Sequence, residues 1–327
     1  VQKVLGAVRR LKDRGISVLY VSHYLGEITE LCDRVTVFRN GTDVGVVDPV
    51  TAESGRELIR LMVGRDLEQL FPERQGSPGQ ERLSVQSLGD QQKFRGVSFE
   101  VRAGEVVGLA GVLGSGCEEI VDALVGLRPV KEGAIVMGGK KKRLSSPAAA
   151  LKQGIVLIPR DRRSDGLVLN LPVRDNINMA TLSEVSPGGI VSRKAVDKRA
   201  REMVQQLDIR PADTARKARF LSGGNQQKTV LGRSLAAKAQ VFILDEPTVG
   251  VDIGAKTEIY RLVSDLAEEG RAVLVSSNDP AEILGLCDRV LVVVRGEIVS
   301  EHRAADLTRD ELIERMTGSV MEGAAGV

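Results

Sequence analysis

The chain contains few of the side chains on which several classes of binding site depend. It has no tryptophan, three tyrosines and six phenylalanines, so a surface that binds nucleic acid by stacking bases is poorly supplied with aromatic rings. Its two histidines and three cysteines show no metal-ligand spacing, so no zinc motif is indicated. The formal net charge of +2 argues neither for nor against a nucleic-acid partner.

Long apolar runs are also missing. No segment approaches the roughly 20 consecutive apolar residues of a membrane-spanning helix, so any membrane role is expected to come through a partner. The sparse cysteines favour a reducing, cytoplasmic setting. With 327 residues, of which 42% are hydrophobic and 28% charged, the chain has the composition of a globular protein with room for one large or two ordinary domains.

The most informative stretch runs from Phe220 to Asp252. Residues 222–224 are Ser-Gly-Gly at the predicted start of a helix, where backbone N–H groups are open to a phosphate because glycine has no Cβ. The apolar run 241–244 predicts a buried strand, and it ends in Asp245 and Glu246. One of these carboxylates can hold Mg²⁺ while the other orients a water. Either motif alone is more often a turn or a loop start, but the two together indicate a nucleotide site.

A glycine-rich loop between a predicted strand and a helix fits part of the P-loop template G-x-x-x-x-G-K-[ST]. Its candidate nucleotide ligands are Gly111, Gly114, Ser115, Gly116, Cys117 and Glu118. The template's lysine is replaced by Cys117, and its Ser/Thr by Glu118. A neutral thiol cannot neutralise phosphates, and Glu118 and Glu119 at a helix N-terminus repel a polyanion. We therefore expect weak nucleotide binding and little catalysis at this loop.

The chain also contains an internal repeat. The pattern from Val18 to Val35 recurs from Val273 to Val290, an offset of 255 residues. A second match relates Glu57–Gly64 to Glu311–Gly318, at an offset of 254 residues. The repeat predicts that the chain is a piece of a longer tandem protein. We expect a C-terminal remnant of a first domain at 1–65, a linker at 66–81, a complete second domain at 82–320 and a tail at 321–327.

Local patterns predict several individual elements. They are a helix over Val1–Gly15, strands over Ser17–Ser22, Val97–Val101, Val106–Ala110, Gly154–Ile158 and Ala272–Ser277, a hairpin over Arg34–Val47, an amphipathic helix over Gly254–Glu269 and a solvated loop at Lys140–Arg143. The basic run at Lys140–Arg143 is not expected to bind nucleic acid.

Taken together, residues 222–224 and the Asp245-Glu246 pair resemble the signature motif and Walker B of ATP-binding-cassette (ABC) ATPases. Residues 247–252 resemble the D-loop that follows Walker B in that family, and Asn225–Lys228 resembles the importers that carry monosaccharides. The resemblance implies an α/β fold of the P-loop NTPase class. It implies a mixed-sheet core with a helical subdomain at about 160–235, preceded by the C-terminal piece of a second copy.

The same resemblance implies ATP and Mg²⁺ as cofactors and assigns roles to residues. Asp245 is the expected metal ligand and Glu246 the expected catalytic carboxylate. His23 resembles the switch histidine of the family, serving the site of the missing domain, and Asn278 takes the equivalent position in the second copy. The remaining expected nucleotide ligands are Ser222, Gly223, Gly224, Gln226 and Phe94.

The role of Phe94 is open, and residues 159–160 depart from the family pattern. Phe94 resembles the residue that stacks on adenine, but a buried core phenylalanine fits its sequence context equally well. Residues 159–160 are Pro-Arg where the family has the glutamine of its Q-loop. With Cys117 and Asn278, this makes three altered positions in the domain's own site.

The family resemblance implies two composite sites, each joining the P-loop of one cassette to the signature motif of another. The intact signature here is expected to serve the missing first ABC domain or a second ATPase copy, and the isolated chain is expected to have little ATPase activity. The implied partners are integral-membrane permease subunits and, through them, a periplasmic or extracellular sugar-binding protein. The implied location is the cytoplasmic face of the cell membrane, with no nucleic acid bound. Two alternatives remain: a soluble ABC ATPase of translation or DNA repair, and a non-catalytic regulatory ABC module.

Overall fold

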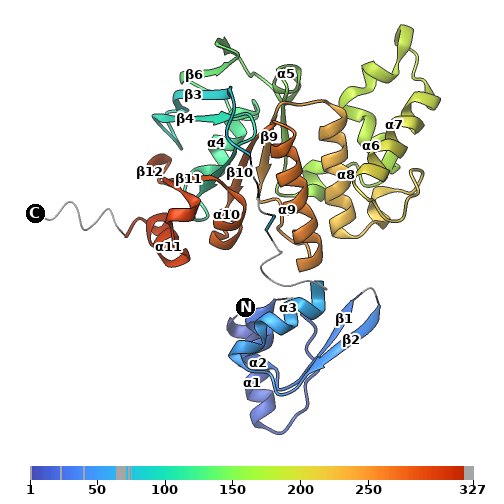
Figure 1. Cartoon of the computed structure of the whole chain (residues 1–327), viewed down its shortest axis with the longest axis vertical. Coiled ribbons are helices and arrows are strands. Elements are labelled where there is room, and N and C mark those ends of the chain that lie inside the picture. Colours follow the sequence, from blue (N-terminus) through green and yellow to red (C-terminus); the bar gives the residue numbers. More distant parts are fainter. Residues whose placement is uncertain are drawn as a thin grey trace, which may run out of the picture. The chain divides into compact units, whose positions relative to one another are not determined.

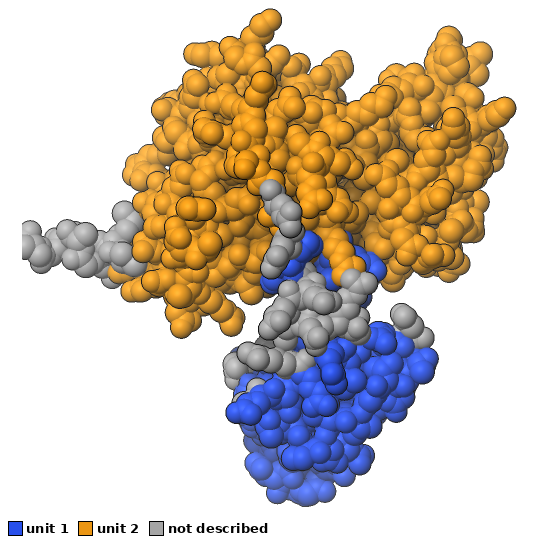
Figure 2. Space-filling view, in the orientation of Figure 1, with its two compact units in different colours: residues 1–72, 251–258 blue, residues 73–250, 259–327 orange. Residues whose placement is uncertain are grey.

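The computed structural model describes residues 2–22, 24–39, 41–63, 71–72, 74 and 76–319. The chain divides into two compact units, which are residues 1–72 with 251–258 and residues 73–250 with 259–327 (Figure 2). The smaller unit contains α1 (Gln2–Asp13), α2 (Leu25–Leu31), β1 (Val35–Arg39), β2 (Thr42–Val47), a 3₁₀ turn at Ala52–Ser54 and α3 (Gly55–Val63).

The smaller unit is built around the β1–β2 hairpin. The two strands pair antiparallel, and Gly41 between them has a φ of +79°, which favours glycine at a tight turn. Apolar side chains of α2, the hairpin and α3 form one core that includes Ile28, Val37, Val47 and Leu58. The predicted helix and hairpin in this part of the chain are therefore confirmed.

The strand predicted over Ser17–Ser22 is wrong. Residues 16–22 have no regular secondary structure, and the side chains of Leu19 and Val21 are 93% and 90% exposed. The described strands of this unit, β1 and β2, pair with one another, and neither pairs with this segment. An apolar segment without a neighbouring strand cannot form the ladder of hydrogen bonds that a sheet requires.

The larger unit contains a six-stranded mixed sheet. In order across the sheet its strands are β12 (Glu297–Arg303), β11 (Arg289–Val294), β5 (Val106–Ala110), β10 (Ala272–Ser277), β9 (Val241–Asp245) and β8 (Ile155–Ile158). All neighbouring pairs are parallel except β11 and β12. Every residue of β5, β9 and β10 is buried, as expected for the continuously apolar central strands of a parallel sheet. The predicted strands at 106–110, 154–158 and 272–277 are confirmed.

A second, antiparallel sheet contains β4 (Val97–Arg102), β3 (Glu81–Gly89), β6 (Glu132–Met137) and β7 (Lys140–Lys142), in that order. The lysine run predicted as a loop is thus an edge strand, and that prediction is corrected. Lysines on an edge strand keep the exposed edge solvated and discourage pairing with another chain, which accounts for the composition of the run.

Helices cover the six-stranded sheet and form a separate group beside it (Figure 1). They are α4 (Cys117–Leu124), α5 (Pro147–Lys152), α6 (Val173–Asn178), α7 (Arg193–Gln206), α8 (Gly223–Ala236), α9 (Ile253–Glu268), α10 (Pro280–Leu286) and α11 (Arg309–Thr317). Short helical turns lie at 162–166, 179–185, 187–189, 218–220 and 304–306. The helices α6, α7 and α8 pack on one another and form the helical subdomain. No helix in the described residues has the length and apolarity needed to cross a bilayer.

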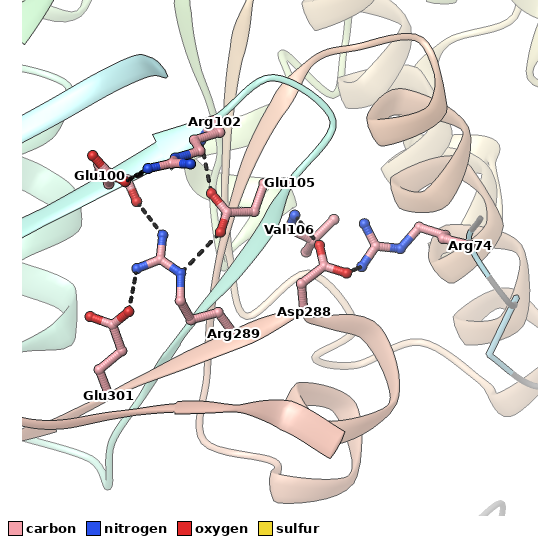
Figure 3. Close-up of polar contacts among 8 residues, drawn as sticks. All are labelled: Arg74, Glu100, Arg102, Glu105, Val106, Asp288, Arg289 and Glu301. Atoms are coloured by element: carbon pink, nitrogen blue, oxygen red, sulfur yellow. Dashed lines mark hydrogen bonds and ion pairs between the residues drawn. The ribbon is translucent and has the colours of Figure 1, made fainter. Parts of the chain in front are cut away.

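A polar network joins the two sheets near the start of β5 (Figure 3). Arg289 of β11 donates to the Glu105 carboxylate at 2.9 Å, to the Glu301 carboxylate at 2.8 Å and to the Glu100 carbonyl at 2.7 Å. Asp288 accepts from the N–H of Val106 at 2.8 Å and from Arg74 at 2.6 Å. Glu105 is only 5% exposed, so its charge requires a partner inside the protein, and Arg289 supplies it.

Candidate functional site

Four loops meet at one edge of the six-stranded sheet. Residues 111–116 follow β5, Asp245 ends β9, Asn278 follows β10, and residues 159–160 follow β8. These four strands are parallel neighbours, so their carboxyl ends lie together. This edge is where open parallel sheets bind ligands. The structure therefore brings the candidate loop, the two acids and Asn278 into one site.

The loop 111–116 requires its glycines. Gly114 and Gly116 have φ values of +82° and +107°, in the region that favours glycine. A Cβ on Gly116 would lie 2.7 Å from the Cα of Gly296, and the carbonyl of Ser115 accepts from the N–H of Gly296 at 2.7 Å. The close approach of residues 295–297 therefore holds the loop in place.

Cys117 and Ser115 point into the protein. Both are buried, and the Ser115 hydroxyl donates to the Cys117 sulfur at 3.3 Å. Burial raises the pKa of the Cys117 thiol to about 12, so the group stays neutral at physiological pH. The loop therefore carries no charge at the position where the P-loop template has a lysine.

The guanidinium of Arg160 also lies at this edge, and the sequence analysis gave it no role. Its Nη1 lies 3.5 Å from Oε2 of Glu118, and its Nη2 lies 3.4 Å from Oδ1 of Asp245. The sequence analysis noted only that glutamine is absent from residues 159–160. A signal was present, because an arginine two residues after the end of a parallel strand is placed at the ligand edge of the sheet.

Asp245 and Glu246 are both buried, at 7% and 5% exposure. Burial raises the pKa of Asp245 and raises the pKa of Glu246 to about 7. Glu246 has a φ of +46°, uncommon for a residue with a side chain, and its N–H donates to the carbonyl of Ser276 at 2.8 Å. Its Oε1 accepts from the backbone N–H of Asn278 at 2.9 Å, while the Asn278 residue itself is exposed. Strand β10 thus fixes the position of the catalytic candidate.

The Ser-Gly-Gly motif lies at the N-terminus of α8, in the helical subdomain. Ser222 is the exposed N-cap residue, and its hydroxyl accepts from the N–H of Asn225 at 3.5 Å and from the Asn225 side chain at 2.9 Å. The first-turn N–H groups of a helix have no acceptor within the helix and favour an anion. Gly224 is buried in the same turn, and Gly223 is half-buried.

Arg162 joins this motif to the segment that follows Glu246. Its Nη1 and Nη2 donate to the carbonyls of Val249 and Gly250, both at 3.0 Å. A Cβ on Gly223 would lie 2.6 Å from Nη2 of Arg162, so glycine at 223 makes room for this guanidinium. The sequence analysis assigned no role to Arg162, because nothing in the local pattern indicates a partner 87 residues away.

Three expected site residues need separate comment. Phe94 is 2% exposed and belongs to the hydrophobic core, so the structure favours the core interpretation, and its ring offers no face to a base. Gln226 is 4% exposed and its amide donates to the carbonyl of Ala218 at 3.2 Å, so its side chain is engaged inside the protein and is not open to a ligand. His23 lies outside the described residues.

The residues at the sheet edge do not fit a magnesium ion. The expected ligand Asp245 is ion-paired with the guanidinium of Arg160, and the neighbouring Glu118 is paired with the same group. In the described part of the chain, no group of three or more His, Cys, Asp or Glu side chains could hold a metal ion.

Comparison with known proteins supports the resemblance. Residues 94–249 match the ABC transporter family. The chain is 43% identical over 319 residues to the ribose import ATP-binding protein RbsA of Cereibacter sphaeroides, covering 98% of this chain and 63% of that protein. It is 44% identical over 313 residues to the ribose import ATP-binding protein RbsA 1 of Streptomyces avermitilis, covering 96% of this chain and 60% of that protein. The chain thus spans less than two thirds of the length of these relatives.

Solved structures show the same fold. An ATP-binding cassette of an ABC transporter, MJ1267 in its ADP conformation, superposes with a TM-score of 0.61 at 24% identity, covering 76% of this chain and 100% of that chain. A nucleotide-free ATP-binding cassette from an ABC transporter gives a TM-score of 0.60 at 22% identity, covering 73% and 95%. The expected α/β fold with a mixed sheet and a helical subdomain is confirmed. Residues 94–249 thus match the ABC transporter family, and the larger unit has the fold of ATP-binding cassettes.

Proposed function

We propose that the chain is part of the ATP-hydrolysing subunit that energises import of a monosaccharide across the cytoplasmic membrane. Its similarity to ribose import ATP-binding proteins over nearly its whole length supports this proposal. Ribose is therefore the first sugar to test. The proposed partners are permease subunits in the membrane and, through them, a sugar-binding protein outside it, which places the chain at the cytoplasmic face.

One observation carries the proposal about mechanism: the altered positions fall on one side of the cassette. The loop 111–116 has a buried neutral thiol where a lysine is needed, whereas Ser222 is exposed at the N-terminus of α8. We infer that residues 222–224 complete a site on the P-loop of another cassette, with His23 belonging to that same site. Hydrolysis takes place there, and ATP with Mg²⁺ is proposed for that composite site.

The matching elements of the two units support a tandem origin for this arrangement. Helix α2 and helix α10 lie 255 residues apart at both ends, and the hairpin β1–β2 corresponds to β11–β12. We propose that residues 1–65 end a first cassette, that 66–81 link it to a second, and that 82–320 form that second cassette with 321–327 as a tail. The other cassette of the composite site is then the first cassette of the same polypeptide or a second ATPase copy.

A regulatory module without catalysis is the second candidate function. It is favoured by the internal pairing of Arg160 with Asp245, which removes the usual metal ligand from use in the chain's own site. In the first candidate, ATP hydrolysis requires residues 222–224 of this chain. In the second candidate it does not. They give opposite results when the signature motif is altered.

The test is sugar uptake into vesicles that contain the permease and the full-length tandem protein. Ser222→Arg places a bulky side chain where the phosphate is expected, and we expect it to abolish ATP turnover and uptake. Ser192→Arg is the matched control, because Ser192 also caps a helix through its hydroxyl but lies outside the motif. Full turnover in Ser222→Arg would contradict the proposal.

A smaller effect is expected at Glu246 in the same assay. Glu246→Gln should cost much less turnover than the equivalent change in the other cassette, because Glu246 belongs to the altered site. Equal losses in the two variants would remove the asymmetry on which the mechanism depends.

A further inference from the structure

Arg160 is a charged group at the ligand edge to which the proposed hydrolysis gives no role. It comes from the loop after β8 and lies between two carboxylates from different elements, Glu118 of α4 and Asp245 of β9. Its side chain is 31% exposed, so it is open to a ligand on one side. A guanidinium in this position supplies the positive charge that Cys117 does not.

The two pairs that Arg160 makes are long. Its nitrogen–oxygen distances are 3.5 and 3.4 Å, whereas strong charge-assisted hydrogen bonds are about 2.7–2.9 Å. Its Nε is buried and has no hydrogen-bond partner in the described residues. Because Nε is buried, only the rest of the guanidinium is open to a ligand, and it contacts that ligand while it stays paired with the two carboxylates.

A divalent cation at this edge would compete with the same guanidinium. It would need the oxygens of Asp245 and Glu118, both of which face Arg160, and it would be repelled by the fixed positive charge. Arginine, in contrast, presents a planar fork that matches the oxygens of a phosphate. Arg160 therefore favours a phosphate and opposes a metal, whereas the carboxylates of Glu118 and Glu119 weaken phosphate binding.

We propose that Arg160 takes the place of the magnesium ion in this cassette's own site, so that residues 111–116 bind the polyphosphate of a nucleotide without a divalent metal. The inference deepens the proposed function, since it rests on the nucleotide-binding role of the fold. In this site Arg160 contacts the phosphate, and Glu118 limits the affinity through its negative charge. The site then holds nucleotide without the metal that the composite site uses.

The first experiment measures ATP binding to the 327-residue chain by calorimetry, once with excess magnesium and once with excess EDTA. We expect the two dissociation constants to agree within about twofold. Arg160→Gln should weaken metal-free binding by about tenfold, and Glu118→Gln should tighten it severalfold. Arg163→Gln is the matched control, because Arg163 is exposed and lies three residues further along, and it should leave binding unchanged.

A second experiment needs no nucleotide. Manganese binding, followed by electron paramagnetic resonance, should be weak in the unaltered chain and in Arg163→Gln. It should become measurable in Arg160→Gln, which frees the carboxylates, and should be lost again when Asp245→Asn is added. This gain of a metal site would not follow if Arg160 served only to hold the loop, and circular dichroism verifies that each variant is folded.

Three results would overturn the proposal: no ATP binding, ATP binding that is lost in EDTA, or an Asp245-dependent manganese site in the unaltered chain. None of them bears on the composite site, because both experiments use this chain alone. A failure of Ser222→Arg to stop transport would in turn leave these binding measurements untouched. The two proposals can therefore fail separately.

Discussion

Two segments of the chain with matching sequence patterns differ in secondary structure. Residues 17–22 and 272–277 share the same spacing of apolar residues and end in Ser22 and Ser277. The second is the central strand β10, paired with β5 and β9, while the first has no regular structure. The difference shows that this pattern specifies a strand only where neighbouring strands satisfy its backbone groups.

The parts of the two segments that depend on local contacts are preserved. Both hairpins have a register shift at the same point, between Val37 and Phe38 and between Val292 and Val293. The hydroxyl of Ser22 donates to Glu27 at 2.9 Å, and that of Ser277 donates to Glu282 at 2.6 Å. The helix, the hairpin and the Ser–Glu hydrogen bond therefore persist in the smaller unit, although the strand before them does not form.

The largest expected effect concerns Arg289, whose counterpart in the first segment is the exposed Arg34. Arg289→Ala leaves the buried Glu105 without its ion-pair partner, although the backbone N–H of Arg102 still donates to it, and we expect a loss of about 2–4 kcal/mol in the unfolding free energy of the larger unit. Arg34→Ala should cost less than about 0.5 kcal/mol. Urea unfolding of both variants measures the contrast. Equal losses would mean that Arg289 and Arg34 contribute to stability in the same way.

An intermediate effect is expected at the two serines that precede His23 and Asn278. Ser277→Ala removes a bond to Glu282, which is 1% exposed, and should lower the unfolding free energy by about 1–2 kcal/mol. Ser22→Ala removes the bond to the half-buried Glu27 and should cost about 0.5 kcal/mol.

Turnover should respond in the opposite order to stability. In the full-length protein, Ser22→Ala should reduce ATP turnover severalfold, because Ser22 adjoins the histidine proposed for the composite site. Ser277→Ala should leave turnover close to normal at a temperature where the variant is folded. ATPase assays on the two variants test this reversal. A larger loss of ATP turnover from Ser277→Ala than from Ser22→Ala would contradict the proposal that hydrolysis takes place at the composite site.

The sequence predicted the local elements and the common edge of the parallel strands, but not the side-chain contacts between distant segments. Strands 106–110 and 272–277 were predicted at their observed bounds, because each is a short apolar run between turn signals. The convergence of Asp245, Asn278 and the loop 111–116 followed from the rule that parallel strands end at one edge. Arg162 could not be assigned a role, because its partners are distant in the sequence and only the fold brings them together. Arg160 could have been placed at the ligand edge from its position after the predicted strand at 154–158, although its pairing with Asp245 depends on the fold.

The smallest expected effect is the pH dependence caused by Glu246, which lies at the sheet edge of the larger unit. Because its folded pKa is raised to about 7 from 4.5, its contribution to stability is complete below about pH 4.5 and is lost as the pH rises through about 7. The hydrogen bond from the backbone N–H of Asn278 favours the charged form and offsets part of the effect of burial, so we expect the unfolding free energy to fall by about 1 kcal/mol between about pH 5 and pH 8. Glu246→Gln should remove this fall, while the exposed control Glu314→Gln should keep it. Urea denaturation at the two pH values measures this fall. If the unfolding free energy of Glu246→Gln fell by the same amount between the two pH values, burial of this carboxylate would not be its cause.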